Sequence, residues 1–255
     1  MGKAAASGAL ALRDRPCYDL DVSGFFTGGW QLLSRRFDLV VFDCDGVLVD
    51  SEVLSCRCLA EVLASHGLVM DAGEAMERFL GRSIAAVAEY FRAAMGRDLP
   101  ASFHSELQRD LTKAFSSDLN ELPHVREALA ACRGRYCLAS SSSPERLAMT
   151  LSAVGLDGDF AGRAFTASMV ARAKPAPDVF LLAARQMKAR PDRTLVIEDS
   201  VNGVLAGKAA GMTVWGFVGG SHHHGRDGAA LLLDAGADHI LRTFAAFVPE
   251  RASAT

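Results

Sequence analysis

The chain has 255 residues, half of them hydrophobic, and a formal net charge of −3. This size and composition are typical of a soluble globular protein of one large or two smaller domains with a substantial core. Its 30 acidic and 27 basic residues nearly cancel and form no long run of one sign, which argues against nucleic acid or an anionic membrane as the main partner. We therefore expect a small-molecule partner and a monomer or weak homo-oligomer.

The cysteines lack the paired spacings of a zinc site or of a secreted disulfide framework, so we interpret them as reduced thiols of a cytoplasmic protein. No apolar run is long enough to span a bilayer. The stretch 4–12 is followed by three charged residues and carries no usable cleavage site, which argues against a secretion signal. Residues 1–35 are treated as an N-terminal extension of unknown role.

The first clear element follows this extension. Leu39–Phe42 is a short continuous apolar run, typical of a strand buried in a parallel sheet, and it ends in Asp43. Asp45 stands one residue further on. Because two adjacent carboxylates repel each other, the pair indicates a cation or a shared proton. Taken alone, the pair is equally compatible with a solvated acidic turn.

Helical patterns without a convincing strand fill the next part of the chain. The predicted helices cover Glu52 to Ser65, Glu74 to Phe79, Ser83 to Met95 and Ser102 to Phe115. We assign residues 53–118 to an inserted, all-helical cap. Between two of these helices lies the triplet Gly81, Arg82 and Ser83, which is flexible and basic and in which Ser83 fits a helix cap.

Strands then alternate with helices, as in a parallel sheet covered on both faces. A second apolar run, 136–139, ends in Ser140, and a third, 195–197, ends in Glu198 and Asp199. Ligands of open α/β sheets bind at the carboxyl ends of the strands, so we expect these polar residues and Asp43 to share one site.

The predicted fold class is therefore α/β, with a Rossmann-like parallel sheet, helices on both of its faces and the inserted helical cap. The core is assigned to residues 36–52 and 119–255. Local signals punctuate its helices: Ser143 followed by Pro144 predicts a helix start, and Gly155 and Gly211 predict helix ends.

Four segments occur in the order typical of the haloacid dehalogenase superfamily. They are Asp43-Cys44-Asp45-Gly46, Leu138-Ala139-Ser140-Ser141, Ala173-Lys174-Pro175-Ala176-Pro177-Asp178 and Glu198-Asp199-Ser200. From about residue 37 to residue 243 the chain resembles this superfamily, in the branch of β-phosphoglucomutase-like and sugar-phosphate phosphatases, including 6-phosphogluconate phosphatases. The continuation Asp50-Ser51-Glu52 is shared with that branch.

The resemblance implies Mg²⁺-dependent hydrolysis of a small phosphomonoester, a sugar or sugar-acid phosphate, through an aspartyl-phosphate. Asp43 is the implied nucleophile and Asp45 the implied general acid and base. The implied phosphate ligands are Ser140, Ser141 and Lys174. The implied metal ligands are Asp43, Asp45 through its carbonyl, Asp199, and Glu198 directly or through water. The triplet 81–83 resembles the substrate-specificity loop of the family's cap.

Two alternatives share these motifs. A sugar-phosphate mutase uses the same chemistry, but Ser55 stands where the mutase resemblance implies a histidine, which favours water as the phosphoryl acceptor. A non-catalytic sensor of phosphometabolites is the second alternative, although every motif residue is present.

Two further features are interpreted as structural. The run 222–224 consists of three histidines without carboxylate or cysteine partners nearby in the sequence, and we interpret it as a polar surface loop rather than a transition-metal site. Cys44 lies between the two aspartates but should point away from them, so we expect an inert buried thiol.

Overall fold

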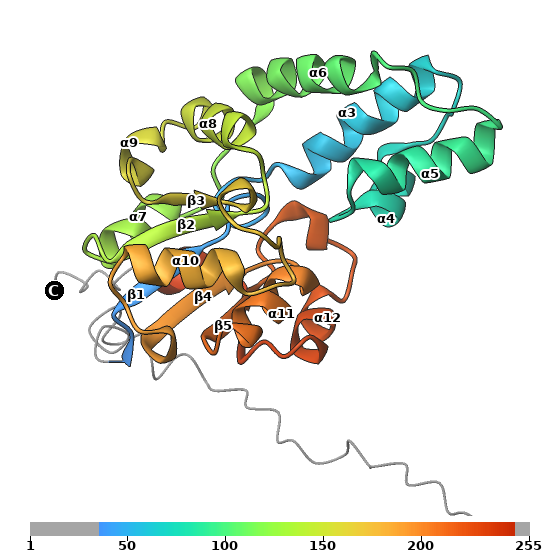
Figure 1. Cartoon of the computed structure of the whole chain (residues 1–255). Helices are drawn as coiled ribbons and strands as arrows, with labels where there is room; N and C mark the ends of the chain where they lie inside the picture. The colour runs from blue at the N-terminus through green and yellow to red at the C-terminus, as the bar shows by residue number, and fades with distance from the viewer. Residues whose placement is uncertain (1–35, 248–255) are drawn as a thin grey trace, which may run out of the picture.

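In the computed structural model, residues 36–247 are described, so the predicted extension 1–35 lies outside the described part of the chain. The centre is a six-stranded sheet in which every pair of neighbouring strands is parallel, in the order β3-β2-β1-β4-β5-β6 (Figure 1). The strands are β1 Leu39–Phe42, β2 Tyr136–Ser140, β3 Ala164–Thr166, β4 Thr194–Glu198, β5 Thr213–Phe217 and β6 His239–Leu241.

The strand order contains a reversal next to β1. The chain moves outward from β1 to β2 and β3, and then returns to place β4 on the other side of β1. In open α/β sheets a ligand binds at such a reversal, outside the carboxyl ends of the strands. The backbone N–H of Asp43 donates to the carbonyl of Ile197 at 3.0 Å, so the segments that follow β1 and β4 leave the sheet side by side.

The two faces of the sheet pack into separate hydrophobic clusters because successive side chains of a strand point in opposite directions. Val40 and Phe42 belong to one cluster, while Leu39 and Val41 belong to the other. The first cluster includes residues of α7 Val125–Ala131, α8 Pro144–Ala153 and α9 Asp157–Phe160. The second includes residues of α10 Asp178–Gln186, α11 Val201–Ala209 and α12 Gly228–Asp234. Four short 3₁₀ helices complete the core: 167–169, 191–193, 221–223 and 244–247.

Of the helices between β1 and β2 in the sequence, the first four form a group beside the sheet in space (Figure 1). They are α3 Glu52–Ser65, α4 Ala72–Phe79, α5 Ile84–Met95 and α6 Phe103–Asp118. Residues 52–118 are all described and contain no strand. Their buried side chains belong to the same hydrophobic cluster as one face of the sheet. The predicted fold class, including an inserted helical cap, is confirmed, whereas the boundaries 53 and 118 remain a prediction.

The predicted helix signals act where they were expected. Ser143 accepts a hydrogen bond from the backbone N–H of Arg146, and Pro144 is the first residue of α8. Gly155 and Gly211 follow α8 and α11 with φ values of 66° and 73°, the left-handed conformation that commonly ends a helix. Two predicted helices were too short, because α4 begins at residue 72 rather than 74 and α6 continues to residue 118 rather than ending at residue 115.

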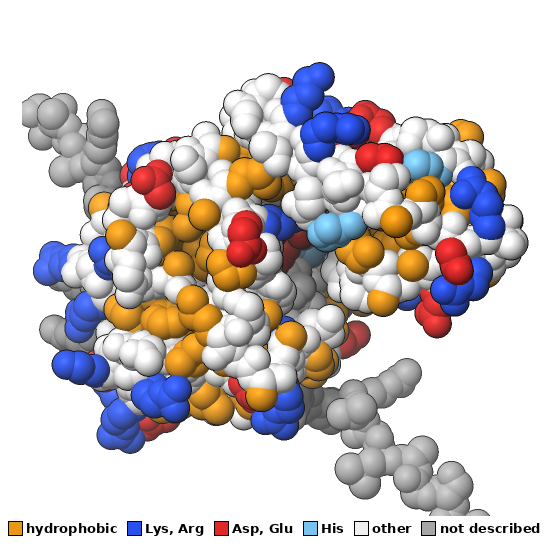
Figure 2. All heavy atoms as spheres, turned by 45° about the horizontal axis from the view of Figure 1, so that its top comes forward, with side chains coloured by type: hydrophobic (Ala, Val, Ile, Leu, Met, Phe, Trp, Pro, Cys, Tyr) orange, Lys and Arg blue, Asp and Glu red, His pale blue; other side chains and the backbone are white. Residues whose placement is uncertain are grey.

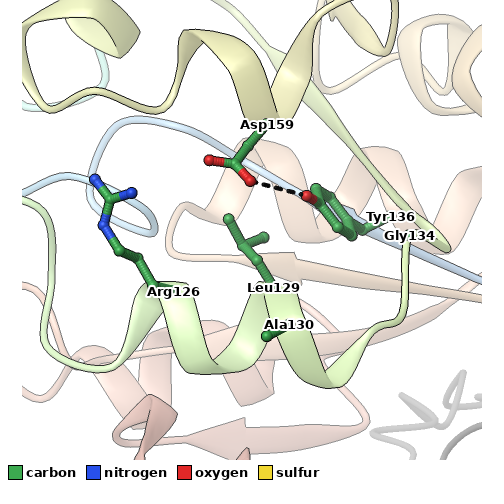
Figure 3. Close-up of a pocket in the computed structure, with 6 residues that line it drawn as sticks. All are labelled: Arg126, Leu129, Ala130, Gly134, Tyr136 and Asp159. Carbon is green, nitrogen blue, oxygen red and sulfur yellow. Dashed lines mark hydrogen bonds between the residues drawn. The ribbon is translucent and has the colours of Figure 1, made fainter.

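No helix within residues 36–247 combines the length and the apolar character needed to cross a membrane. A small pocket of about 220 Å³ lies between α7, α9 and the start of β2, where the hydroxyl of Tyr136 donates to Asp159 at 3.3 Å (Figure 3). Because Tyr136 is the first residue of its strand, this pocket lies at the amino end of the sheet, away from the predicted site.

Candidate active site

A buried ammonium group joins three segments that are far apart in the sequence. Lys174 lies on the loop before α10, and its Nζ is 2.6 Å from Oδ1 of Asp43 and 2.6 Å from Oε1 of Glu198. It also donates to the carbonyl of Ala139 in β2 at 3.0 Å. The side chain of Lys174 is only 4% exposed. The structure therefore brings Asp43, Lys174 and Glu198 together at the carboxyl edge of the sheet.

The charges of this group shift each other's pKa. Burial by itself lowers the pKa of Lys174, but the carboxylates of Asp43 and Glu198 outweigh burial and raise that pKa above its usual value. Lys174 therefore stays positively charged. Burial raises the pKa of Asp43 well above its usual value, and the negative charges of Glu198 and Asp199 act in the same direction, against the opposing effect of Lys174.

Glu198 has protein partners for both of its carboxylate oxygens. Oε1 contacts Lys174, while Oε2 accepts hydrogen bonds from the backbone N–H and the hydroxyl of Ser200, each at 2.9 Å. This arrangement orients Lys174. Both carboxylate oxygens of Glu198 are therefore occupied by protein groups.

Asp199 and the histidine run lie next to each other. The Nε2 atom of His222 is 3.0 Å from Oδ2 of Asp199, and His222 is only 2% exposed. The prediction of a polar surface loop is therefore wrong for His222, although it holds for the exposed His224. The sequence could not show the carboxylate partner, because Asp199 follows a different strand. Asp199, His222 and His223 also offer metal-ligand atoms within 4.8 Å of one another.

Asp45 is held by three donors. Its Oδ1 accepts from the hydroxyl of Ser51 at 2.6 Å and lies 3.5 Å from Nη2 of Arg146, and its Oδ2 accepts from the hydroxyl of Ser142 at 2.8 Å. Burial raises the pKa of Asp45, but Arg146 and the two hydroxyl groups outweigh burial and lower the pKa below its usual value. In this arrangement Asp45 is a carboxylate.

The sequence interpretation missed Arg146 together with Ser51 and Ser142. Arg146 lies in the first turn of α8, and besides contacting Asp45 it donates to the hydroxyl of Ser55 on α3 at 3.0 Å. Its guanidinium also lies 5.3 Å from the ring centroid of Phe115 on α6. These contacts link the core to the helical cap, and no local spacing in the sequence announces them.

The two serines predicted to bind phosphate differ in burial. Ser140 ends β2, is 1% exposed, and accepts a hydrogen bond from the backbone N–H of Ser142 at 3.0 Å, which leaves its own hydroxyl hydrogen available. Ser141 is exposed. Ser140 therefore lies beside the Lys174 group, one residue from the carbonyl of Ala139 that Lys174 contacts.

The cap triplet is not part of this polar cluster. Gly81, Arg82 and Ser83 are all exposed between α4 and α5. Ser83 accepts a hydrogen bond from the backbone N–H of Ala86 at 3.4 Å, so it caps α5. The prediction that Ser83 caps a helix is confirmed. Within residues 36–247, no hydrogen bond or ion pair joins the triplet to Asp43 or Asp45.

Cys44 is fully buried, and burial raises the pKa of its thiol well above the usual value. A thiol of this kind is a poor nucleophile. The expectation of a buried side chain between the two aspartates is confirmed.

The charges at this edge of the sheet suit a divalent cation. The side chains are four carboxylates and two cations: Asp43, Asp45, Glu198 and Asp199, with Lys174 and Arg146. Burial is the largest cause that raises the pKa of both Asp43 and Asp199 well above the usual value, and the neighbouring carboxylates act in the same direction. Carboxylate and carbonyl oxygens are the ligands that Mg²⁺ prefers. Figure 2 shows acidic, basic and histidine side chains gathered in the hollow between the two parts of the molecule.

Comparison with known proteins identifies the family. Residues 37–211 match the model of haloacid dehalogenase-like hydrolases. The chain is similar to 6-phosphogluconate phosphatase of Escherichia coli, with 26% identity over 74% of this chain and 86% of that protein. It is also similar to a phosphorylated carbohydrates phosphatase of Thermotoga maritima, with 33% identity over 80% of this chain and 94% of that protein.

A solved structure leads to the same family. A haloacid dehalogenase family hydrolase from Deinococcus radiodurans, crystallised with bound phosphate and sodium, is 36% identical, with a TM-score of 0.70 over 82% of this chain and 93% of that chain. The resemblance that the four sequence motifs indicated is thereby confirmed. The chain belongs to the family of haloacid dehalogenase-like hydrolases.

Proposed function

We propose that this hydrolase is a phosphatase that acts on a small phosphomonoester, a sugar or sugar-acid phosphate, with Asp43 as the nucleophile and Mg²⁺ as the cofactor. The observation that carries the proposal is the contact between the Asp43 carboxylate and the buried ammonium of Lys174 at the carboxyl edge of the sheet. The names of the two phosphatases to which the chain is similar support the substrate class.

In the first step, a carboxylate oxygen of Asp43 attacks phosphorus, so that a bond from phosphorus to Asp43 forms while the ester bond breaks. Asp45 gives a proton to the leaving alkoxide. Because Ser51, Ser142 and Arg146 hold Asp45 as a carboxylate here, it must exchange at least part of these contacts and take up a proton before it can act as an acid.

In the second step, water attacks the same phosphorus and gives its proton to Asp45, and the bond to Asp43 breaks with release of inorganic phosphate. The carboxylate form of Asp45 is the form that this step needs. Lys174 supplies a fixed positive charge beside Asp43 throughout, and Ser140 and Ser141 would donate hydrogen bonds to the phosphoryl oxygens.

The residues that would hold Mg²⁺ are Asp43, Asp199, the carbonyl of Asp45, and Glu198 through water. The bound cation would stabilise negative charge on the phosphoryl group during transfer. For the cellular location we propose the cytoplasm, because the five cysteines within the described residues are free and buried, as expected in a reducing compartment.

Replacing the nucleophile tests the proposal most simply. We expect Asp43→Asn to lower the hydrolysis of an aryl phosphate by at least about 1,000-fold without loss of the fold, because the amide cannot form the acyl phosphate. EDTA should abolish the wild-type activity, and Mg²⁺ should restore it.

The measurement is release of inorganic phosphate from the aryl phosphate and from a panel of sugar phosphates. Asp157→Asn, at an exposed position in α9, is the matched control and should behave as wild type. Near-wild-type turnover by Asp43→Asn would refute the nucleophile assignment. If the wild-type protein shows no Mg²⁺-dependent turnover on any substrate, the sensor alternative is favoured.

A sugar-phosphate mutase is the second candidate function. The hydroxyl of Ser55, at the position where the mutase resemblance implies a histidine, accepts a hydrogen bond from Arg146. No imidazole at this position would protect an aspartyl-phosphate from water, so we expect phosphate release from a hexose phosphate to be faster than interconversion of its positional isomers. Phosphorus NMR on a single sample measures both rates, and faster interconversion would favour the mutase.

The exposed Arg82 is proposed to contact the part of the substrate that is not phosphate. We expect Arg82→Ala to raise KM for a sugar-acid phosphate by about tenfold, the loss of one charge-assisted hydrogen bond, and to leave kcat/KM for an aryl phosphate unchanged. The control is Arg109→Ala, whose side chain is 70% exposed on the cap helix α6. Equal effects on both substrates, or none on either, would argue against this role.

Glu52 gives the site a measurable pH dependence. It begins α3, and burial together with the charges of Asp45 and Asp199 raises its pKa from 4.5 to about 7. The folded protein therefore binds this proton more tightly than the unfolded chain does. The stability that results is complete below pH 4.5 and is lost as the pH rises through about 7.

We therefore compare the free energy of unfolding of Glu52→Gln with that of wild type in EDTA. The difference should change in favour of the variant when the pH is raised from 5 to 8, by on the order of 1–2 kcal/mol. Urea denaturation at the two pH values measures this difference. Glu61→Gln, 65% exposed on the same helix, is the control and should follow wild type. A difference between Glu52→Gln and wild type that does not change with pH would contradict the electrostatic account.

A further inference from the structure

His222 is a buried polar residue that the proposed catalytic steps do not use. It lies in the 3₁₀ turn Ser221–His223 after β5, is 2% exposed, and places Nε2 at 3.0 Å from Oδ2 of Asp199. The turn is fixed to the core segment that precedes the cap, because the backbone N–H and the hydroxyl of Ser221 both donate to Oδ1 of Asp50, at 3.0 and 2.8 Å.

Two glycines leave just enough room for the imidazole. A Cβ atom on Gly220 would lie 2.8 Å from both Cε1 and Nδ1 of His222. A Cβ atom on Gly46, where φ is +77°, would lie 2.0 Å from Oδ2 of Asp199 and 2.8 Å from Cε1 of His222. The imidazole and the carboxylate are therefore packed as one unit against the loop that carries Asp43 and Asp45.

The two ring nitrogens of His222 have different surroundings. Nε2 of His222 lies 3.0 Å from Oδ2 of Asp199. For this contact to be attractive when Asp199 is an ionised ligand, Nε2 has to carry the ring hydrogen. Nδ1 of His222 is buried and has no hydrogen-bond partner within residues 36–247. An unpartnered buried nitrogen is unfavourable, so a side chain that served only to fill space here would better be apolar. The contact from Nε2 to Asp199 is the interaction that explains an imidazole at this position.

We propose that His222 is a positioning residue for the metal site: its Nε2–H group holds Oδ2 of Asp199 and leaves Oδ1 of Asp199 for the cation. This inference rests on the proposed function, because that function makes Asp199 a ligand of Mg²⁺. Partners that orient a ligating carboxylate typically contribute about 10- to 100-fold to metal affinity.

The test compares two replacements of similar shape that differ in their ability to donate. His222→Gln keeps a side-chain N–H group at about the reach of Nε2, and His222→Met has none. His224→Ala, at the exposed end of the same run, is the control. Isothermal titration calorimetry measures Mg²⁺ affinity of the full chain directly, circular dichroism checks the fold, and phosphate release is followed in parallel.

We expect His222→Met to bind Mg²⁺ at least tenfold more weakly than wild type, His222→Gln to recover most of that loss, and His224→Ala to match wild type. The activity of His222→Met should return at high Mg²⁺ concentration. Equal Mg²⁺ affinities for the Gln and Met variants would overturn the proposal. So would unfolding of both variants, because the imidazole would then be required for packing.

Two other outcomes distinguish the proposed role of His222 from direct metal binding by the histidines and from the proposed phosphatase function. Zn²⁺ binding that is tight in wild type and lost in both His222 variants and in His223→Ala would overturn the proposal, because the imidazoles would then be metal ligands themselves. Mg²⁺ binding that follows the expected order in a protein without phosphatase activity would support the role of His222 while refuting the proposed function.

Discussion

The contacts of one buried ammonium group organise this site. Lys174 is 2.6 Å from both Asp43 and Glu198, and all three side chains are almost completely removed from water. Burying two carboxylates without a counter-charge would be strongly unfavourable, so the fold depends on Lys174 reaching this position from a loop 131 positions after Asp43. One ammonium group does not balance the charge of Asp43, Glu198 and Asp199. The remaining negative charge supports the proposal that this edge of the sheet binds a divalent cation.

A second set of contacts links Asp45 to the helical cap. Asp45 is held by Ser51, just before α3, and by Arg146, which also contacts Ser55 within α3. These two donors, together with Ser142, keep Asp45 as a carboxylate in this arrangement. The position of α3 relative to the core and the protonation of Asp45 are therefore physically coupled, since a shift of α3 would change the contacts that Asp45 receives.

The sequence was most informative where function depends on local features. An apolar run that ends in Asp43 predicted both a buried strand and the position of its carboxylate, and β1 covers the predicted residues 39–42. Other features depend on contacts that no local pattern encodes. Ser142 contacts Asp45 across 97 positions, and His222 contacts a carboxylate that belongs to another strand. The role of Lys174 came from family resemblance, because an isolated lysine between helices is usually a solvated surface group.

The central claim is that these segments form one metal-dependent phosphoryl-transfer site. A crystal structure of the protein with Mg²⁺ and a beryllium fluoride analogue of the phosphoryl group tests it most directly. The account predicts the analogue bound to a carboxylate oxygen of Asp43, with Lys174 and Ser140 as its neighbours and Mg²⁺ held by Asp43, Asp199 and the carbonyl of Asp45. Density for the analogue at another residue, or Mg²⁺ bound away from Asp199, would contradict it.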